Sequence, residues 1–342
     1  MDRRGFTLGL GAAAAAIPGL RASAQETEAA LHAAARREGE LVLYTGTLVE
    51  VIEDLTKAFQ AKYPGIRTQY WRGDTSQVTQ RFETEAAAGR HTADLLLLTD
   101  RQSKVLHARG LTQPYRSRHL GNYQTELHAR EDAYANYALT LASFAWNTQL
   151  VPAAEAPRTW EDLLHPRWAG KMAIQDPLQA GGAGIWFITL YEVWGEQRWT
   201  DYFTRLGRQR LRYGRYLQVQ EMLASGEVAI QIAAYPNYIE PLKARGGPAD
   251  WGTPDPVIWT GLSISMSRRA PHSAAAKLFT DFMLSAEAQG RLNNLGLLPA
   301  LRNEWPAGYA RLGNARLYPQ AHELEAERMA FFQRKMREMF TR

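Results

Sequence analysis

Hydrophobic and polar positions alternate in blocks along the first third of the chain. ELVLYTGT, from Glu40, predicts a short buried strand that runs into a small-residue turn. Apolar residues then recur at helical spacing until KYPG ends the helix: Leu48, Val51, Ile52, Leu55 and Phe59. IRTQYW and ADLLLLTD predict two more strands, followed by helices at about residues 75–88 and 101–109. The continuous leucines of ADLLLLTD are typical of a parallel strand covered on both faces.

The alternation resumes after about residue 147. In TWEDLLHPRWAGKMAIQDP, Thr159 and Asp162 predict a reciprocally capped helix that Pro166 ends, and KMAIQD is the next strand. GGAGIWFITLYEVWG predicts a long apolar helix. EVAIQIAAY and LSISM predict further strands, before helices that run to the C-terminus. Strands that alternate with helices predict an α/β fold with mainly parallel sheets.

The chain has 342 residues, which is too long for one ordinary core and suits two lobes. Because no low-complexity linker separates them, we expect strands to cross between the lobes at about 138–147 and 256–264 and to form a hinge. Residues 25–140 and 263–342, with the C-terminal helices, are assigned to lobe 1, and residues 141–262 to lobe 2. The last helix, HELEAERMAFFQRKMREMF, is expected to pack across the lobes.

Residues 1–24 have the pattern of a cleavable export signal. Arg3 and Arg4 precede an apolar stretch from Phe6 to Ile17, and small residues up to Ala24 predict cleavage near that position. The paired arginines favour twin-arginine export over general secretion. The apolar stretch is shorter than the roughly 20 residues that a membrane-spanning helix needs. We therefore expect the mature protein in the periplasm.

Charge and cysteine content exclude several classes of function. The formal net charge is +5, and the leader carries +2 of it (three arginines against one aspartate), which leaves +3, too small for a nucleic-acid-binding surface. The densest basic stretch, RLGRQRLRYGRY, is interpreted as a solvated helix end followed by a strand. The absence of cysteine excludes thiol catalysis, thiolate metal sites and iron–sulfur clusters.

An ordered series of segments resembles the extracytoplasmic solute-binding proteins of ABC importers, in the branch that includes ferric-iron, phosphonate, thiamine and polyamine binders. The series comprises LVLYTG, FQAKYPGI, TQRFETEAAAGRHTADLLLLTD, FAWNTQLV, PRTWEDLLHPRWAGKMAIQDP, LASGEVAI and PHSAAAKLFTDFMLSAEAQ. The resemblance implies two hinged lobes that close on a small solute and deliver it to a membrane permease. It implies no catalytic residue and no cofactor, and we expect a monomer.

The glycine turn before the apolar helix is the first candidate for solute binding. Gly181, Gly182 and Gly184 would bring backbone N–H groups and a helix N-terminus to a phosphate, phosphonate or carboxylate. The resemblance adds that similar proteins bind solute at this loop. The alternative is that the glycines only permit a tight turn and close packing of helix on strand. Asp176, in the strand end before this turn, is included among the candidates.

Ligands of parallel sheets bind beyond the carboxyl ends of the strands, so the loops of the first lobe are expected to share one rim. Tyr44-Thr45-Gly46-Thr47 offers hydroxyl groups to the same anion, or forms a structural turn. Arg72 neutralises solute charge or pairs with its neighbour Asp74. Asp100 faces a solute amine or caps the next helix.

Aromatic and basic residues of the second lobe complete the candidates. Trp146, Tyr235 and Tyr238 are expected to stack on an organic solute or to lie in the hinge core, and Arg215 is a second anion-binding candidate or a solvated side chain. Ferric iron is the alternative substrate, with Tyr235 and Tyr238 as ligands. The two tyrosines are not adjacent as in ferric-binding relatives, however, and Trp146 cannot ligate iron where some of those proteins have a tyrosine.

The sequence predicts a binding protein for a small anionic organic solute. It lacks His-Glu-x-x-His and Gly-x-Ser-x-Gly motifs, and its histidines show no metal-ligand spacing. A lyase or hydrolase of organophosphates is retained only as a minor alternative.

Overall fold

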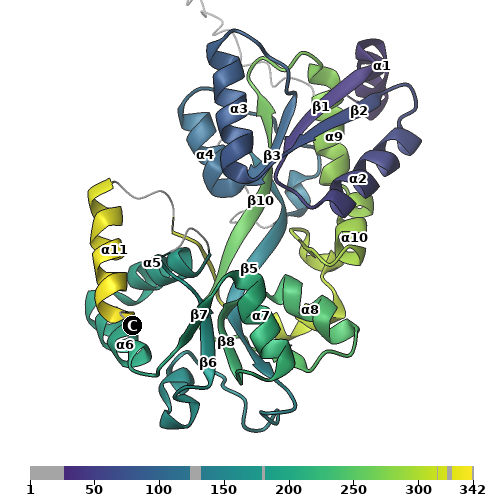
Figure 1. Cartoon of the computed structure of the whole chain (residues 1–342). Helices are drawn as coiled ribbons and strands as arrows, with labels where there is room; N and C mark the ends of the chain where they lie inside the picture. Colours follow the sequence, from purple (N-terminus) through teal and green to yellow (C-terminus); the bar gives the residue numbers. More distant parts are fainter. Residues whose placement is uncertain (1–26, 124–131, 179–181, 314, 322–325, 341–342) are drawn as a thin grey trace, which may run out of the picture.

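The computed structural model describes residues 27–123, 132–178, 182–313, 315–321 and 326–340. The predicted export signal, residues 1–24, lies outside the described residues. The elements before the first crossing strand are α1 (Glu28–Glu38), β1 (Glu40–Thr45), α2 (Val49–Lys62), β2 (Arg67–Arg72), α3 (Thr75–Ala87), β3 (Leu95–Thr99), α4 (Asp100–Ala108) and β4 (Thr112–Gln113). They form the upper lobe in Figure 1, together with two helices from later in the chain.

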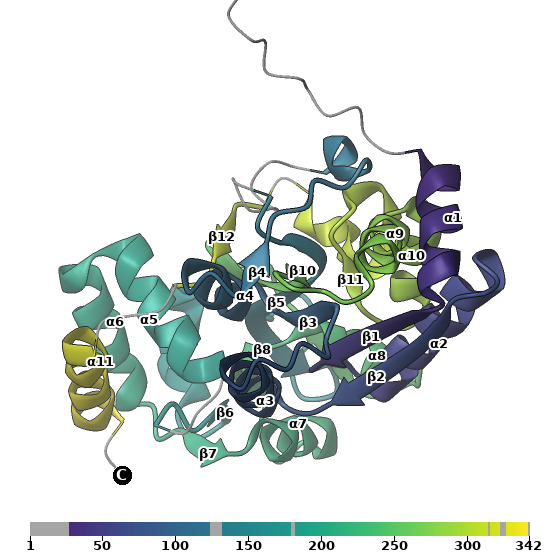
Figure 2. The same ribbon diagram turned by 90° about the horizontal axis from the view of Figure 1, so that it is seen from above.

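The crossing strands are β5 (Ala135–Asn147) and β10 (Val257–Ser267). Between them lie β6 (Met172–Gln175), α5 (Gly182–Trp194), α6 (Glu196–Gly207), β7 (Arg212–Gly214), α7 (Tyr216–Ser225), β8 (Ile230–Ala234), α8 (Pro236–Ala244) and β9 (Ala249–Trp251). After them come α9 (Ser273–Met283), α10 (Ala286–Asn294), β11 (Leu298–Pro299), β12 (Leu317–Pro319) and α11 (Ala326–Met339). Both long strands run from one lobe into the other, as predicted (Figures 1 and 2).

The main sheet has the strand order β2-β1-β3-β10-β5-β8-β6-β7. β1 pairs in parallel with β2 and β3, and β6 pairs in parallel with β7 and β8. β10 and β5 are antiparallel to each other and to the strands beside them. Each lobe therefore has a mainly parallel sheet, and the predicted boundaries at residues 140 and 262 fall inside the two continuous crossing strands.

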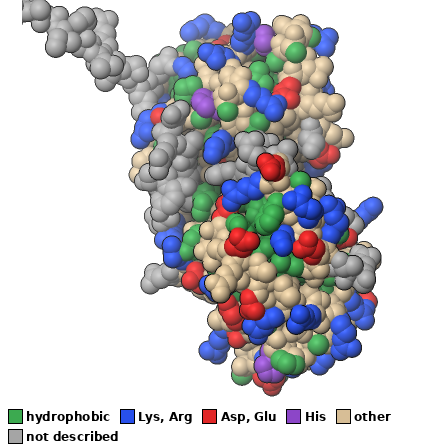
Figure 3. All heavy atoms as spheres, turned by 90° about the vertical axis from the view of Figure 1, so that its left-hand side faces the viewer, with side chains coloured by type: hydrophobic (Ala, Val, Ile, Leu, Met, Phe, Trp, Pro, Cys, Tyr) green, Lys and Arg blue, Asp and Glu red, His purple; other side chains and the backbone are tan. Residues whose placement is uncertain are grey.

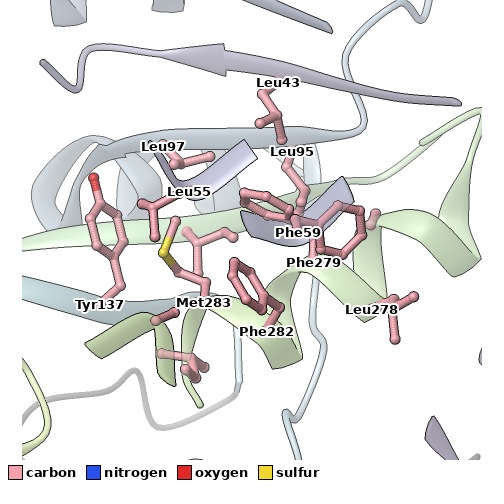
Figure 4. Packing of buried hydrophobic residues seen from close by; sticks show 14 of the residues in the cluster. Leu43, Leu55, Phe59, Leu95, Leu97, Tyr137, Leu278, Phe279, Phe282 and Met283 are labelled. Atoms are coloured by element: carbon pink, nitrogen blue, oxygen red, sulfur yellow. The ribbon is translucent and has the colours of Figure 1, made fainter. Parts of the chain in front are cut away.

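The leucine run of β3 is buried on both faces of the first-lobe sheet, as its continuous apolar pattern predicts. Leu95 and Leu97 pack into a cluster with α2 and α9, which includes Phe59 and Phe279 (Figure 4). Leu96 and Leu98 pack on the opposite face, under α3 and α4. Alternate side chains of a strand point to opposite faces, so one strand serves both clusters.

The second lobe is also covered on both faces, and its coverage corrects one expectation. α5, α6 and α11 pack on one face, where Phe332 of α11 contacts Trp199 of α6 and Phe187 of α5. The expectation that residues 263–342 all belong to lobe 1 is therefore wrong for α11, which also does not pack across the lobes. Its apolar stripe is buried among aromatic side chains of the second lobe.

The basic stretch from Arg205 to Tyr216 is a helix end and a strand, as predicted, and two of its five arginines form ion pairs. Arg205 contacts Asp201 at 3.4 Å, and Arg212 pairs with Glu227. On the face shown in Figure 3, Lys and Arg side chains are interspersed with Asp and Glu. This stretch is thus part of a solvated surface of mixed charge.

Removing the ring of Phe332 tests the docking of α11. Phe332 is fully buried, so we expect Phe332→Ala to lower the free energy of unfolding by about 3–5 kcal/mol. Phe331→Ala removes the same ring from a half-buried neighbour and is expected to lower it less than half as much. Urea denaturation of both variants measures the difference. Equal losses would contradict the docking of α11 through Phe332.

Candidate functional site

Two adjoining cavities lie between the lobes. The first has a volume of about 240 Å³ and the second about 540 Å³. Residues that line both are Thr75, Thr99, Thr140, Tyr235 and Leu262. The first is also lined by Gly46, Thr47, Leu48, Leu97, Leu98, Tyr137, Asn237, Tyr238 and Leu297. The second is also lined by Arg101, Gln102, Ala142, Ile185, Trp186, Ile258, Thr260 and Gln320.

The first-lobe side of the first cavity is a rim of three loops, each beyond the carboxyl end of a strand. Thr47, Thr75 and Thr99 follow β1, β2 and β3 and line this cavity together, as expected of such loops. Hydrogen bonds hold the first loop in place. Arg72 Nε donates to the Thr47 carbonyl oxygen at 2.7 Å, and the Thr47 and Tyr137 hydroxyl oxygens lie 2.7 Å apart. Arg72 therefore positions the rim and is not itself a lining residue.

Two helices begin at the first cavity without a side-chain cap. The N-cap of α2 is Leu48 and the N-cap of α8 is Tyr235, and neither side chain accepts a hydrogen bond from its helix. By contrast, Asp74 caps α3 and Thr99 caps α4. Uncapped first-turn N–H groups carry partial positive charge and need acceptors. The first cavity thus lies between two free helix N-termini, one from each lobe.

Three tyrosines of the second lobe cluster beside the cavities. The ring centroid of Tyr216 lies 4.7 Å from that of Tyr235 and 5.1 Å from that of Tyr238. The Tyr235 backbone N–H donates to the Tyr216 hydroxyl oxygen at 3.0 Å. Burial raises the pKa of Tyr235 to about 12 and raises the pKa of Tyr216 as well. At neutral pH these phenols are protonated and act as hydrogen-bond donors or stacking surfaces.

Asp100 is the first residue of α4, and its carboxylate accepts hydrogen bonds from N–H groups of the protein. The Arg101 backbone N–H donates to Oδ1 at 2.7 Å, and the Gln320 side chain lies 3.5 Å from the same oxygen. Burial raises the pKa of the Asp100 carboxyl to about 6, although these donors favour its charged form. Asp100 therefore stabilises the start of α4. It lines neither cavity, so its position does not favour contact with a solute amine.

The structure brings Gly46, Thr47, Tyr235 and Tyr238 together at the first cavity. It places two other residues of the first loop elsewhere. The Tyr44 side chain points to the opposite face of the sheet, where its hydroxyl donates to Glu85 at 2.7 Å. Thr45 is fully buried and accepts from the Thr47 backbone N–H. These two are structural because strand alternation and the turn direct their side chains inward.

Trp146, Asp176 and Arg215 line neither cavity. Trp146 is buried in the aromatic core of the second lobe, where β5 directs it under the helices. Asp176 Oδ1 accepts from the Leu178 backbone N–H at 3.0 Å within its turn. Arg215 is exposed at the N-terminus of α7, as its alternative interpretation states. Their predicted contact with solute is not supported by their positions.

The glycine turn is described only in part. Gly181 lies outside the described residues, and Gly182 is the first residue of α5. A Cβ atom on Gly184 would lie 3.1 Å from the Pro177 carbonyl oxygen, so this glycine permits close packing of the helix on the preceding turn. Gly184 lines neither cavity, although Ile185 and Trp186 of the same helix line the second. Anion binding by the turn stays a prediction.

Several lining residues were missed by the sequence analysis. Leu48 and Thr75 follow strands, so the rim argument applied to the next residue of each loop would have found them. Arg101 follows Asp100 directly and had the same signal. Gln320 had no such signal in the sequence. It lies in the cleft because β12, directly before it, pairs with the crossing strand β10.

The described part of the chain contains no group of three or more His, Cys, Asp or Glu residues arranged to hold a metal ion. Among the same residues, none of the helices combines the length and apolar character needed to cross a membrane.

A change at Asp100 tests the effect of its burial. The folded pKa of about 6 exceeds the ordinary value of 3.8, so the stabilising contribution of the protonated form is present below about pH 4 and is lost as the pH rises through 6. Relative to Asp100→Asn, the wild type should lose up to about 3 kcal/mol of unfolding free energy between pH 4 and 7. Denaturant titrations across this range measure it. Asp74→Asn, at an exposed cap, is the matched control, and an identical pH profile for all three proteins would refute the shift.

Comparison with solved structures shows the fold. A substrate-binding protein of an ABC transporter from Agrobacterium tumefaciens matches with a TM-score of 0.72 at 16% identity, over 88% of this chain and 94% of that one. AfuA from Actinobacillus pleuropneumoniae, a periplasmic binding protein with fructose-6-phosphate bound, matches with a TM-score of 0.65 at 22% identity, over 88% and 96%. Iron-bound HitA from Pseudomonas aeruginosa matches with a TM-score of 0.70 at 20% identity, over 87% and 99%.

Comparison of sequences identifies the family. An uncharacterized protein of Haemophilus influenzae is 27% identical over 271 residues, which cover 76% of this chain and 77% of the relative. Residues 91–310, more than half of the chain, match the family model described as bacterial extracellular solute-binding protein. With its two lobes, hinge strands and intervening cavities, this chain belongs to the family of bacterial extracellular solute-binding proteins.

Proposed function

We propose that this protein captures a small anionic organic solute in the cleft between its lobes and passes it to the permease of an ABC importer. The anion is a phosphate, phosphonate or carboxylate group. The protein acts in the periplasm as a monomer without a cofactor, after export through a twin-arginine signal that is cleaved near Ala24. It releases the solute unchanged, because it binds and does not catalyse.

The convergence of two uncapped helix N-termini on the first cavity carries this proposal. α2 and α8 belong to different lobes, and neither N-terminus has a side-chain cap. In α8, Pro236 has no N–H, and the Tyr238 N–H donates to the Tyr235 carbonyl oxygen at 2.9 Å. The Asn237 N–H is therefore the donor that this helix offers. An anion between them gains hydrogen bonds and favourable dipole interactions from both sides. The hydroxyl groups of Thr47 and Tyr238 add donors, and none of the acidic residues that the structure describes lines either cavity to repel the anion.

Closure follows from the division of the site between the lobes. A solute held by one lobe makes only half of its contacts, so it binds the closed form more tightly and shifts the population toward it. A solute with micromolar affinity supplies about 8 kcal/mol in total. This exceeds the few kcal/mol by which hinged proteins commonly favour one form over another.

The solved neighbours support both an anion and iron as solutes, since AfuA holds a sugar phosphate and HitA holds iron. The site favours the anion. Fe(III) prefers phenolate and carboxylate oxygens. Tyr235 and Tyr238 line the first cavity, but among the described residues no Asp, Glu or His lines either cavity to complete an iron site.

Calorimetry combined with small-angle X-ray scattering tests the proposal. Organic phosphates, phosphonates and carboxylates, and ferric ion as citrate, are titrated into the purified mature protein. At least one organic anion should bind and reduce the radius of gyration, and ferric ion should give no visible phenolate-to-iron absorption. Tight iron binding with such a band would assign the alternative function. Scattering unchanged by every solute would refute closure.

Leu48, the uncapped N-cap of α2, separates helix stability from anion binding. Leu48 is 44% exposed, so Leu48→Asp loses little packing and should cap α2, which raises the unfolding free energy by about 1 kcal/mol. The introduced carboxylate accepts hydrogen bonds from the first-turn N–H groups and repels an anionic solute, so the affinity for the solute should fall at least about tenfold. Leu48→Asn caps equally well without charge and should weaken binding less. Thermal unfolding and calorimetry measure both effects, and tight binding by Leu48→Asp would exclude the first cavity as the anion site.

A further inference from the structure

The second cavity offers hydrogen-bond donors, and none of the described residues that line it is acidic. Arg101 is the one charged residue among those that line either cavity in the described part of the chain. Within that part, its guanidinium makes no hydrogen bond or ion pair. A half-buried guanidinium with five donors and no acceptor calls for an acceptor from outside the protein.

Trp186 forms part of the wall of the second cavity. Its side chain is 1% exposed, and its buried indole N–H has no acceptor among the described residues. Because this nitrogen is itself buried, the indole bounds the cavity, and Arg101 is the donor that a solute can reach.

Gln320 presents its amide N–H₂ rather than its carbonyl to this region. Its Oε1 accepts from the Thr260 hydroxyl at 2.6 Å, and its Nε2 lies at the long distance of 3.5 Å from Asp100 Oδ1. The neighbouring segment is fixed on both sides. β12 pairs with β10, and the Ala321 backbone N–H donates to the Thr189 hydroxyl oxygen of α5 at 2.9 Å. Gln320 lies beyond residues 91–310, so this wall of the cleft is outside the part that matches the family model.

This donor set distinguishes two kinds of solute body. A polyhydroxyl body needs acceptors for its O–H groups, which carboxylates supply best, and no carboxylate of the described residues lines the cavity. A carboxylate or second phosphate has only acceptors and satisfies Arg101 with a charge-assisted bond to the guanidinium, beside the amide of Gln320. The cavity therefore matches an acidic group in preference to hydroxyl groups.

We propose that the solute is a bifunctional acid, with one anionic group between α2 and α8 in the first cavity and a second on Arg101 in the adjoining cavity. The two cavities share lining residues such as Thr140 and Tyr235, so one small molecule spans both. Arg101 is the specificity-determining residue for the second group. This inference rests on the proposed function, because it requires an anion in the first cavity.

Three probes of increasing complexity test the inference by calorimetry: inorganic phosphate, glycerol 3-phosphate and 3-phosphoglycerate. The last two share a phosphate ester and differ in whether the far end is a hydroxyl or a carboxylate. The wild type should bind 3-phosphoglycerate at least about tenfold more tightly than glycerol 3-phosphate, as a charge-assisted bond implies. Arg101→Gln should reduce this ratio to within about twofold and leave the affinity for inorganic phosphate unchanged.

Arg215→Gln is the matched control, because it removes an exposed arginine of the second lobe that lines neither cavity. It should retain the wild-type ratio. Equal affinity of the wild type for the two esters would overturn the bifunctional solute and leave the proposed function standing, since an anion still binds. The same holds if Arg101→Gln keeps the full ratio. Failure of all three probes to bind at millimolar concentration would overturn the inference for phosphorylated acids, and failure of the whole panel of organic anions would overturn the proposed function as well.

Discussion

The antiparallel pairing of β5 with β10 is the constraint on which the rest of the structure depends. Seven residue pairs, from Ile258 opposite Ala142 to Ile264 opposite Ala135, join the two strands where the chain passes between the lobes. β10 also pairs with β3 of the first lobe, and β5 also pairs with β8 of the second, so neither lobe is attached by a free tether. A change of angle between the lobes must be absorbed by twisting this ribbon, whose register shifts between Leu262 and Ser263. Such an irregularity concentrates bending at one place in a strand pair.

This ribbon also forms the floor of the site. Thr140 of β5 and Leu262 of β10 line both cavities, so a solute lies directly on the element that must deform. The rim above it is rigid, because Arg72 and Tyr137 hold the Thr47 loop through hydrogen bonds of 2.7 Å. The second lobe offers its stacked tyrosines in the same way. Two preorganised walls on a deformable floor allow closure with little reordering of side chains, which reduces the entropy that binding must overcome.

The sequence predicted the architecture well and the site in part, and physical reasons account for the difference. Hydrophobic periodicity identified the strands and helices, because burial on one or both faces of an element produces a local sequence pattern, such as the leucines of β3. Thr159 and Asp162 do cap each other, but over the short 3₁₀ helix Glu161–Leu164, because Pro166 leaves no room for another turn. The amphipathic pattern of α11 indicated a buried stripe without naming the lobe that covers it. Helical periodicity contains no information about the partner surface.

Within the site, the same limit acts at the scale of single residues. Loops after parallel strands predicted the rim, but not which of their side chains reach it. Strand alternation in β1 directs Tyr44 to the opposite face of the sheet, whereas the turn after β1 brings Thr47 to the cavity. Arg101 and Gln320 approach each other from distant parts of the chain, and only the sheet order brings β12 to the crossing strand. The amino-acid composition also does not reveal the favourable charge of the cleft, because this charge arises from backbone N–H groups at helix ends rather than from side chains. A site built in this way binds an anion through many weak, oriented dipoles. Opening of the lobes separates these dipoles from the solute, so one motion both ends recognition and frees the solute for the permease.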